Sequence, residues 1–256
     1  MCCPQSTVAS SHEPVVGIGN RWREQAPFFL LYILGFMVEA AKTLLLMLSA
    51  LFPIVNPLGG SPVFLARTEN YPEEARRKLA QQVAVNSFFV LAGSYFIGRY
   101  ILEFFGISLP VVQVGGGLIV ISTGWTMLKQ GGGDDRQQLN QSMRPQDLYG
   151  QAFYPLTLPL TVGPGSISVA ITLGANTARH HPVLVLSMSA ALVAFALIAI
   201  SVYLCYAFAD RLAWALGATG MSVLLRLSSF LLVCIGVQIV WNGASTLLAS
   251  SALNAK

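Results

Sequence analysis

The sequence predicts an all-α integral membrane protein: six transmembrane helices arranged as a 3+3 inverted repeat, with two of the helices discontinuous. Three observations carry this prediction. Charged residues make up 10% of the 256 residues, against about 25% in an ordinary soluble domain. Long apolar runs alternate with short polar segments. Two of these runs are interrupted by proline and glycine in matching positions of the two halves.

The composition excludes several classes of protein. With 54% hydrophobic residues, the chain has too few polar side chains to cover the surface of a soluble enzyme. The net charge of +4 is spread over the loops and forms no basic stripe of the kind that binds nucleic acid. Runs this long and apolar can satisfy their backbone hydrogen bonds in a bilayer as α-helices. We therefore expect a membrane protein that is not an enzyme and has no nucleic-acid partner.

Six apolar runs are long enough to cross a bilayer, whose hydrocarbon core of about 30 Å requires about 20 residues of helix. The longest polar segment between them begins Gly131-Gly132-Gly133-Asp134-Asp135, a composition typical of a flexible linker. The predicted spans are 43–66, 80–102, 107–128, 150–174, 183–208 and 223–248.

The linker divides the chain into its predicted domains. Residues 42–128 form the first three-helix repeat, 129–148 a flexible cytoplasmic linker, and 149–256 the second three-helix repeat. Residues 1–41 are an N-terminal extension, of which 1–26 are expected to be disordered. The apolar stretch after them is expected to lie along the membrane interface or to lengthen the first helix. A cleaved signal peptide and a seventh span are the alternatives, although no A-x-A cleavage pattern follows this stretch.

Basic residues predict the orientation, because loops rich in Lys and Arg stay in the cytoplasm. With six spans, the larger set of basic residues falls on one side, which we expect to be cytoplasmic. Both termini are then on the non-cytoplasmic side of a plasma (bacterial inner) membrane. The larger set comprises Arg67, Arg76, Arg77, Lys78, Lys129, Arg136, Arg144 and Arg211.

Two of the predicted spans are interrupted by proline and glycine, within 51–62 and 154–166. Each proline removes a helical hydrogen bond, and each glycine adds backbone freedom. Both spans are therefore expected to consist of a helix, an unwound stretch and a second helix. Ser61 before Pro62 is favourable for a helix N-cap followed by the first helical residue, and Ser166 is its expected counterpart.

The two interruptions lie at equivalent places in the predicted repeats. Aligning Pro57 with Pro164 also aligns the second span with the fifth and the third with the sixth. Because each repeat has an odd number of spans, the two repeats must be oppositely oriented in the membrane. Inverted repeats with interrupted spans in corresponding positions are typical of secondary transporters, which bind substrate there. The alternative is that the prolines only kink tightly packed helices.

The interruptions predict a binding site for a small zwitterion. Helix N-termini near Ser61 and Ser166 would direct free N–H groups and positive dipole ends toward a carboxylate. Carbonyl groups exposed by Pro57 and Pro164, with the Asn56 side chain, would hold an ammonium group or a cation. The predicted substrate-binding residues are Asn56, Pro57, Gly59, Gly60, Ser61, Thr161, Gly163, Pro164, Gly165 and Ser166.

Other polar residues within the spans are neutral, and no Asp or Glu lies near the middle of a span. This pattern disfavours a carboxylate proton relay, and neither a metal site nor a cofactor is expected. A coupling proton or sodium ion is compatible with the sequence but not indicated by it. Gly115-Gly116-Gly117, with Gly124, favours close helix packing. The possible accessory polar residues, for which helix–helix hydrogen bonding is the alternative, are Asn86, Gln113, Gln238 and Asn242.

Several segments together resemble the MarC family of membrane proteins over roughly residues 42–248. They are Phe52 to Gly59, Phe105 to Ser108, Gly116 to Leu118, Pro159 to Gly165, and Phe230 to Gln238 with Asn242-Gly243. The resemblance implies six helices, inverted repeats and, in some members, transport of small neutral amino acids such as glycine and alanine. Family members usually carry Arg at the position of Gln113, and residues 1–41 have no counterpart.

The sequence thus predicts a secondary transporter of small neutral amino acids or similar small zwitterions, which works by alternating access around the two interruptions. A passive channel or export pore for small polar solutes is the first alternative. A membrane scaffold protein, in which the prolines are architectural, is the second. The expected partners are a small-molecule substrate and the lipid bilayer, and the oligomeric state is left open.

Overall fold

The computed structural model describes residues 18–130, 150, 152–177 and 184–254, and every regular element within them is a helix. The chain divides into two units, Met1–Glu39 and Ala40–Lys256. Helix α1 (Ile18–Val55) begins in the first unit and ends in the second. Residues 18–26, which were expected to be disordered, are therefore helical. The predicted linker falls almost entirely outside the described residues.

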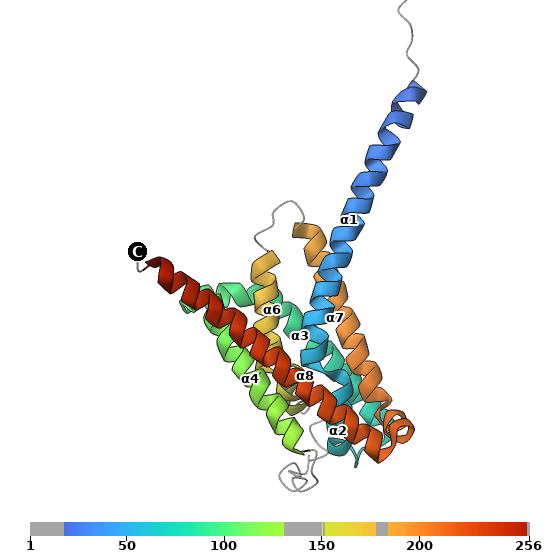
Figure 1. The fold of residues 1–256 in the computed structure, drawn as a ribbon. Coiled ribbons are helices and arrows are strands. Elements are labelled where there is room, and N and C mark those ends of the chain that lie inside the picture. Colours follow the sequence, from blue (N-terminus) through green and yellow to red (C-terminus); the bar gives the residue numbers. More distant parts are fainter. Residues whose placement is uncertain (1–17, 131–149, 151, 178–183, 255–256) are drawn as a thin grey trace, which may run out of the picture. The chain divides into compact units, whose positions relative to one another are not determined.

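The second unit is a bundle of helices (Figure 1). Five helices are long and apolar enough to span a membrane, and the bent pair η2–α6 makes a sixth if it is counted as one span. The six predicted runs therefore correspond to observed helices. After α1, the elements in chain order are α2 (Pro57–Arg67), α3 (Glu73–Phe104), α4 (Leu109–Gln130), η2 (Ala152–Thr161), α6 (Pro164–Thr177), α7 (Leu184–Ala207) and α8 (Ala209–Asn254).

The ends of α3 show how local sequence sets the helix boundaries. Two acidic residues, Glu73 and Glu74, lie in its first turn, where negative charge is favourable next to the positive end of the helix dipole. At the other end Gly106 has a φ of 66°, a left-handed conformation that glycine adopts without steric cost. The N–H groups of Gly106 and Ile107 donate to the carbonyls of Glu103 and Leu102, at 3.1 and 2.9 Å, which closes the helix.

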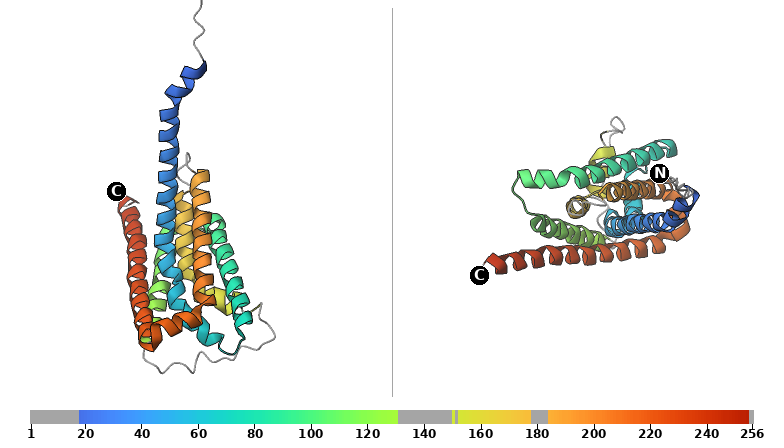
Figure 2. Two further views of the ribbon diagram at one scale, coloured as in Figure 1. Left: turned by 90° about the vertical axis from the view of Figure 1, so that its right-hand side faces the viewer. Right: turned by 90° about the horizontal axis from the view of Figure 1, so that it is seen from above.

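Helices α4 and α8 are in backbone contact along one edge of the bundle (Figure 2). A Cβ atom on Gly117 would lie 2.8 Å from the Gly236 carbonyl oxygen, and one on Gly236 would lie 2.9 Å from the Gly117 carbonyl oxygen. These distances leave no room for a side chain, so the two helices can approach this closely because both residues are glycine.

The same close contact is repeated one heptad to either side. A Cβ on Gly124 would lie 2.9 Å from the carbonyl oxygen of Ser229, and one on Gly243 would lie 2.7 Å from that of Pro110. Residue numbers therefore rise along α4 as they fall along α8, so the two helices are antiparallel. The contacts are also reciprocal, because each helix offers a glycine to the backbone of the other. The close packing predicted for Gly117 and Gly124 is confirmed.

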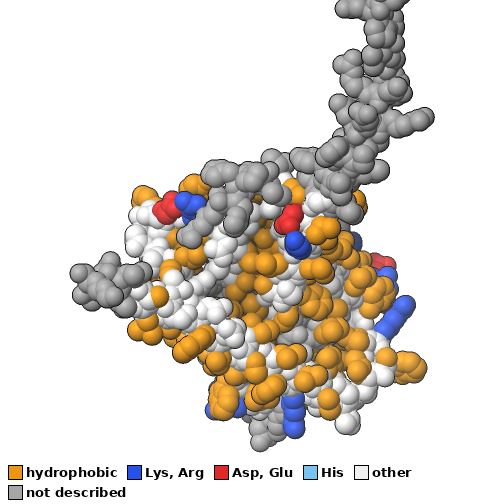
Figure 3. Space-filling model, turned by 45° about the horizontal axis from the view of Figure 1, so that its top comes forward, with side chains coloured by type: hydrophobic (Ala, Val, Ile, Leu, Met, Phe, Trp, Pro, Cys, Tyr) orange, Lys and Arg blue, Asp and Glu red, His pale blue; other side chains and the backbone are white. Residues whose placement is uncertain are grey.

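The bundle is apolar inside and over much of its surface. Helix α3 packs against α6 and α7, while α2 packs against α7 and α8. Figure 3 shows a face of the described residues that is largely covered by hydrophobic side chains, with charged side chains in a few separate places. An apolar exterior is what a hydrocarbon solvent requires. Fully buried residues of the core include Met47, Leu51, Leu79, Leu91, Phe195 and Ile198.

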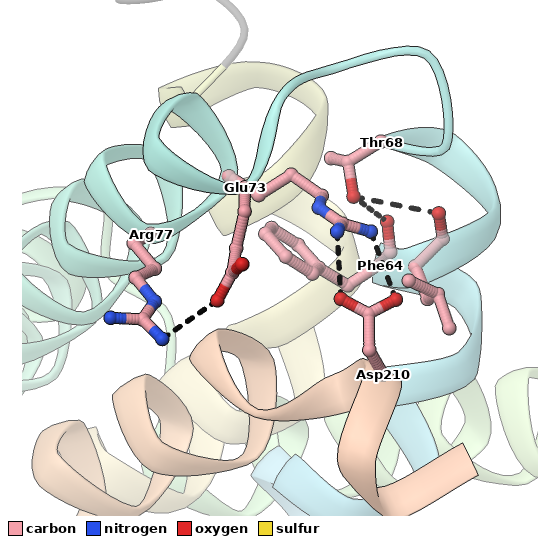
Figure 4. A network of polar contacts seen from close by, with 7 residues as sticks. Phe64, Thr68, Glu73, Arg77 and Asp210 are labelled. Atoms are coloured by element: carbon pink, nitrogen blue, oxygen red, sulfur yellow. Dashed lines mark hydrogen bonds and ion pairs between the residues drawn. The ribbon is translucent and has the colours of Figure 1, made fainter. Parts of the chain in front are cut away.

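A polar network ties the start of α3 to the start of α8 (Figure 4). Arg76 and Asp210 form a two-pronged ion pair, with N···O distances of 2.7 and 3.0 Å. Beside it, Arg77 pairs with Glu73 at 2.7 Å, and the Thr68 hydroxyl at the end of α2 donates to the Phe64 carbonyl at 2.8 Å. Charged groups thus gather where α2 ends and α3 begins.

The α4–α8 contact makes a direct prediction about stability. Gly117→Val is expected to lower the free energy of unfolding by about 1–3 kcal/mol, because the new side chain collides with the α8 backbone. The control is Gly115→Val on the same helix, where a Cβ atom meets nothing within 4 Å. Thermal unfolding of the purified protein in detergent measures both. Equal unfolding temperatures for the two variants would contradict this account of the contact.

Candidate functional site

The first interruption is a single residue that leaves the helical conformation. Helix α1 ends at Val55, Asn56 has φ 47° and ψ 60°, and α2 begins at Pro57. Asparagine is enriched in this left-handed region, and proline is favoured at the first position of a helix. The Asn56 side-chain oxygen accepts a hydrogen bond from the Gly59 N–H at 3.1 Å. The break therefore caps its own new helix.

The prediction that the new helix begins with Ser61 as its N-cap is wrong. Ser61 and Pro62 lie inside α2, and the buried Ser61 hydroxyl donates to the Leu58 carbonyl at 2.8 Å. In a regular helix the N–H of residue 62 would donate to that carbonyl, but proline has no N–H. The serine hydroxyl takes over this hydrogen bond, so the proline is tolerated within the helix.

The second interruption is longer and bends the chain by 71° between η2 and α6. Within η2, Tyr154 and Leu158 have extended backbone angles, and each precedes a proline. The Thr157 and Thr161 hydroxyls donate to carbonyls five residues earlier, both at 2.7 Å. These side-chain hydrogen bonds tie each threonine to the preceding turn of η2.

Helix α6 begins at Pro164 and not at Ser166, so the predicted N-cap role of Ser166 is also wrong. The first hydrogen bond into the helix runs from the Ile167 N–H to the Gly163 carbonyl, at 3.2 Å. Pro164 occupies the first position, for which its fixed φ is suited. Ser166 instead lies in the first turn, where its side chain is free for another role.

One buried tyrosine of α7 contacts both interrupted spans. The Tyr206 hydroxyl lies 3.0 Å from the Thr161 hydroxyl oxygen of η2. A Cβ atom on Gly60 of α2 would lie 2.5 Å from the same Tyr206 oxygen, and the Tyr206 ring stacks on Phe64 with centroids 4.6 Å apart. Because Thr161 uses its own proton in the bond to Leu156, Tyr206 is the donor to Thr161. Nothing in the sequence pattern singled out this tyrosine.

A cavity of about 240 Å³ lies beside the second interruption. Ser166 is 1% exposed and lines this cavity, and its hydroxyl has no hydrogen-bond partner among the described residues. A buried polar group without a partner is costly, so this hydroxyl marks a place for a ligand. The lining comes from α1, α4, η2, α6 and α8 and comprises Ile54, Ile119, Val120, Thr123, Pro159, Leu160, Thr161, Gly163, Pro164, Gly165, Ser166 and Leu232.

The electrostatics of this cavity suit a small dipolar solute. The N–H groups of Gly165 and Ser166 precede the first hydrogen bond of α6 and carry the positive end of its dipole. Hydroxyl groups of Thr161 and Ser166 also belong to the lining, which contains no charged side chain. Helix-end donors and hydroxyl oxygens therefore meet at one cavity. Such a site can hold a carboxylate and an ammonium group of one molecule.

The predicted binding residues divide into two groups. Those of the second interruption line the cavity together: Thr161, Gly163, Pro164, Gly165 and Ser166. Those of the first interruption are part of α2 or its cap and do not line it: Asn56, Pro57, Gly59, Gly60 and Ser61. The two groups approach each other through the Tyr206 contact described above.

None of the four accessory polar residues lines this cavity. Asn86 faces a separate cavity of about 440 Å³, whose lining comes from α3 and η2. Gln113 packs against Gly243, where a glycine Cβ would lie 3.0 Å from the Gln113 Cβ. The Gln238 amide donates to the Asn242 side-chain oxygen at 2.9 Å, on an exposed face of α8.

Known proteins show clear similarity to the chain. The family described as MarC family integral membrane protein matches residues 41–248. The inner membrane protein MarC of Salmonella typhimurium strain LT2 is 31% identical over 214 residues, covering 81% of this chain and 96% of that protein. The inner membrane protein MarC of Escherichia coli O1:K1 is 30% identical over 214 residues, again covering 81% of this chain and 96% of that protein. No solved structure matches the chain.

Removing the Tyr206 hydroxyl tests its contact with the second interruption. Tyr206→Phe is expected to lower the free energy of unfolding by about 0.5–1.5 kcal/mol, because it deletes one buried hydrogen bond. Tyr203→Phe, three residues earlier on α7, is the control, since Tyr203 is only half-buried. Thermal unfolding in detergent compares them, and a Tyr206→Phe variant as stable as the control would rule out the bridge.

Proposed function

Because the chain belongs to the MarC family of integral membrane proteins, we propose that it is a secondary transporter of small neutral amino acids or similar small zwitterions. Transport proceeds by alternating access around the two interrupted spans. The observation that carries this proposal is the cavity at the start of α6, which is lined by Ser166, a residue whose buried hydroxyl has no partner among the described residues. The substrate carboxylate binds at that helix N-terminus, and its ammonium group binds at hydroxyl oxygens of the same lining.

The packing of the helices supports a 3+3 inverted repeat. If the halves are equivalent, α2, α3 and α4 of the first half correspond to α6, α7 and α8 of the second. The contact of α3 with α6 then has its counterpart in the contact of α7 with α2. The contact of α4 with α6 likewise has its counterpart in that of α8 with α2, and all four contacts are present. The reciprocal glycines Gly117 and Gly236 support an axis of this exchange between α4 and α8. Inverted repeats of this kind let one half move against the other around a central site.

Tyr206 physically connects the two interrupted spans, which take part in the proposed movement. It touches Gly60 in one interrupted span and hydrogen-bonds Thr161 in the other. A change of angle at the second interruption therefore alters the packing of the first. We propose that this contact holds the conformation seen here and is released when the cavity opens to the other side of the membrane.

The orientation follows from the basic residues. Arg76, Arg77 and Lys78 lie at the start of α3, near the end of α2. We propose that this end faces the cytoplasm and that both termini lie on the other side. The relatives are named inner membrane proteins, and we propose the same location for this chain in a bacterial cell.

Ligand binding can be tested on the purified protein. A panel of neutral amino acids, with and without sodium, is expected to contain a ligand that raises the unfolding temperature. At 100 times its dissociation constant a ligand stabilises the folded state by about 2.7 kcal/mol. Ser166→Ala is expected to weaken that binding by at least about tenfold, since it deletes a hydrogen bond to a charged group. If no member of the panel shifts the unfolding temperature, the protein is a channel or a scaffold instead.

Transport is tested by counterflow in proteoliposomes, because a carrier exchanges labelled for unlabelled solute and a passive pore does not. Gly165→Val is expected to abolish counterflow, since its side chain enters the space of Val120 beside the cavity. The control is Gly93→Val on α3, where a Cβ meets nothing within 4 Å. Should Gly165→Val insert and fold, yet exchange solute as fast as the control, the cavity is not the binding site.

A further inference from the structure

Helix α8 has two opposite faces. Its inner face is buried against α4 through Ser229, Leu232, Gly236 and Gly243. The other, which we call the outer face, lies along one edge of the bundle (Figure 2). Its residues are all exposed and recur every three or four positions, as expected for one side of a helix: Leu227, Leu231, Cys234, Gln238, Asn242 and Ser245.

Two amide side chains of the outer face lie at the depth of the hydrocarbon. The part of α8 that is long and apolar enough to span a membrane is Thr219–Ser250. With a rise of 1.5 Å per residue, Gln238 lies about 5 Å and Asn242 about 11 Å along the helix from the middle of this span. Both distances are smaller than half the thickness of the hydrocarbon core, about 15 Å. Lipid tails offer these amides no hydrogen-bond partner.

The hydrogen bond between the two amides does not use all of their polar atoms. The Gln238 nitrogen donates to the Asn242 side-chain oxygen at 2.9 Å. Of the hydrogen bonds found among the described residues, this is the one that these two side chains make. The Gln238 oxygen therefore remains as an acceptor, while the Asn242 nitrogen and the second N–H of Gln238 remain as donors. By contrast, the Ser245 hydroxyl on the same face donates to the Asn242 backbone carbonyl at 3.1 Å.

We propose that the outer face of α8 is a homodimer interface, in which the Gln238–Asn242 pair of one copy binds the same pair of a second copy. Because each pair keeps both an acceptor and donors, the face is self-complementary, as a two-fold interface requires. Copies inserted in the same orientation are related by an axis along the membrane normal. Equivalent residues of the two α8 helices therefore meet. A polar residue in an otherwise apolar helix seam also sets its register.

Cys234 offers a test, because it lies on the outer face one turn before Gln238. In a chain with Cys2, Cys3 and Cys205 changed to serine, Cys234 of two copies would meet near the axis. Oxidation in native membranes is expected to give a disulfide-linked dimer that a reductant reverses. The double variant Gln238→Leu with Asn242→Leu is expected to reduce dimer formation by about 5- to 30-fold, through loss of the amide bonds.

The control is a variant whose single cysteine replaces Leu118 of α4. Leu118 is 54% exposed and does not belong to the outer face. This variant measures cross-linking by random collision in the membrane. Cross-linking of Cys234 no faster than at this control position would overturn the proposal, and so would unchanged cross-linking in the double leucine variant. The outer face lies opposite the side of α8 that reaches the cavity, so a failure here leaves the proposed transport function standing.

Discussion

In hydrocarbon every backbone N–H and carbonyl must find its partner within the protein, and this constraint shapes both interrupted spans. Proline removes donors from each of them, and side chains supply replacements. Ser61 donates to the carbonyl that Pro62 leaves without a donor, and Thr157 and Thr161 donate to carbonyls of η2. At the start of α6 the N–H groups of the first turn have no acceptor within the helix, and the buried Ser166 hydroxyl has no partner among the described residues. The candidate site thus lies where the protein leaves polar groups for a ligand.

The two interruptions differ, although they occupy equivalent positions along the chain. The first is one left-handed residue whose side chain caps the following helix. The second bends the chain by 71° and opens onto a cavity. In the inverted repeat that we propose, equivalent segments exchange their conformations when access alternates. The capped and the open interruption then represent two states of one element, and Tyr206 links them.

The helix pair α4–α8 supplies the rigid part of this arrangement. Backbone atoms approach each other closely at Gly117 and Gly236, which leaves little room for one helix to shift against the other. Its inner side reaches the cavity through Val120 and Leu232, while its far side carries the Gln238–Asn242 pair. A dimer formed through that far side would hold this rigid pair in place while the interrupted spans move.

The sequence by itself determined the class of the protein, its helical runs and the location of both interruptions, because hydropathy and proline act on neighbouring residues. It also indicated the close packing around Gly117. It did not predict where each new helix begins. A serine before a proline is typical of a helix N-terminus, but here Asn56 caps the helix and Ser61 makes its hydrogen bond inside it. The tertiary structure alone decided which candidates share a cavity and brought in Tyr206, which is 45 positions from Thr161 in the chain. Contacts between distant helices depend on crossing geometry, and no local pattern records that geometry.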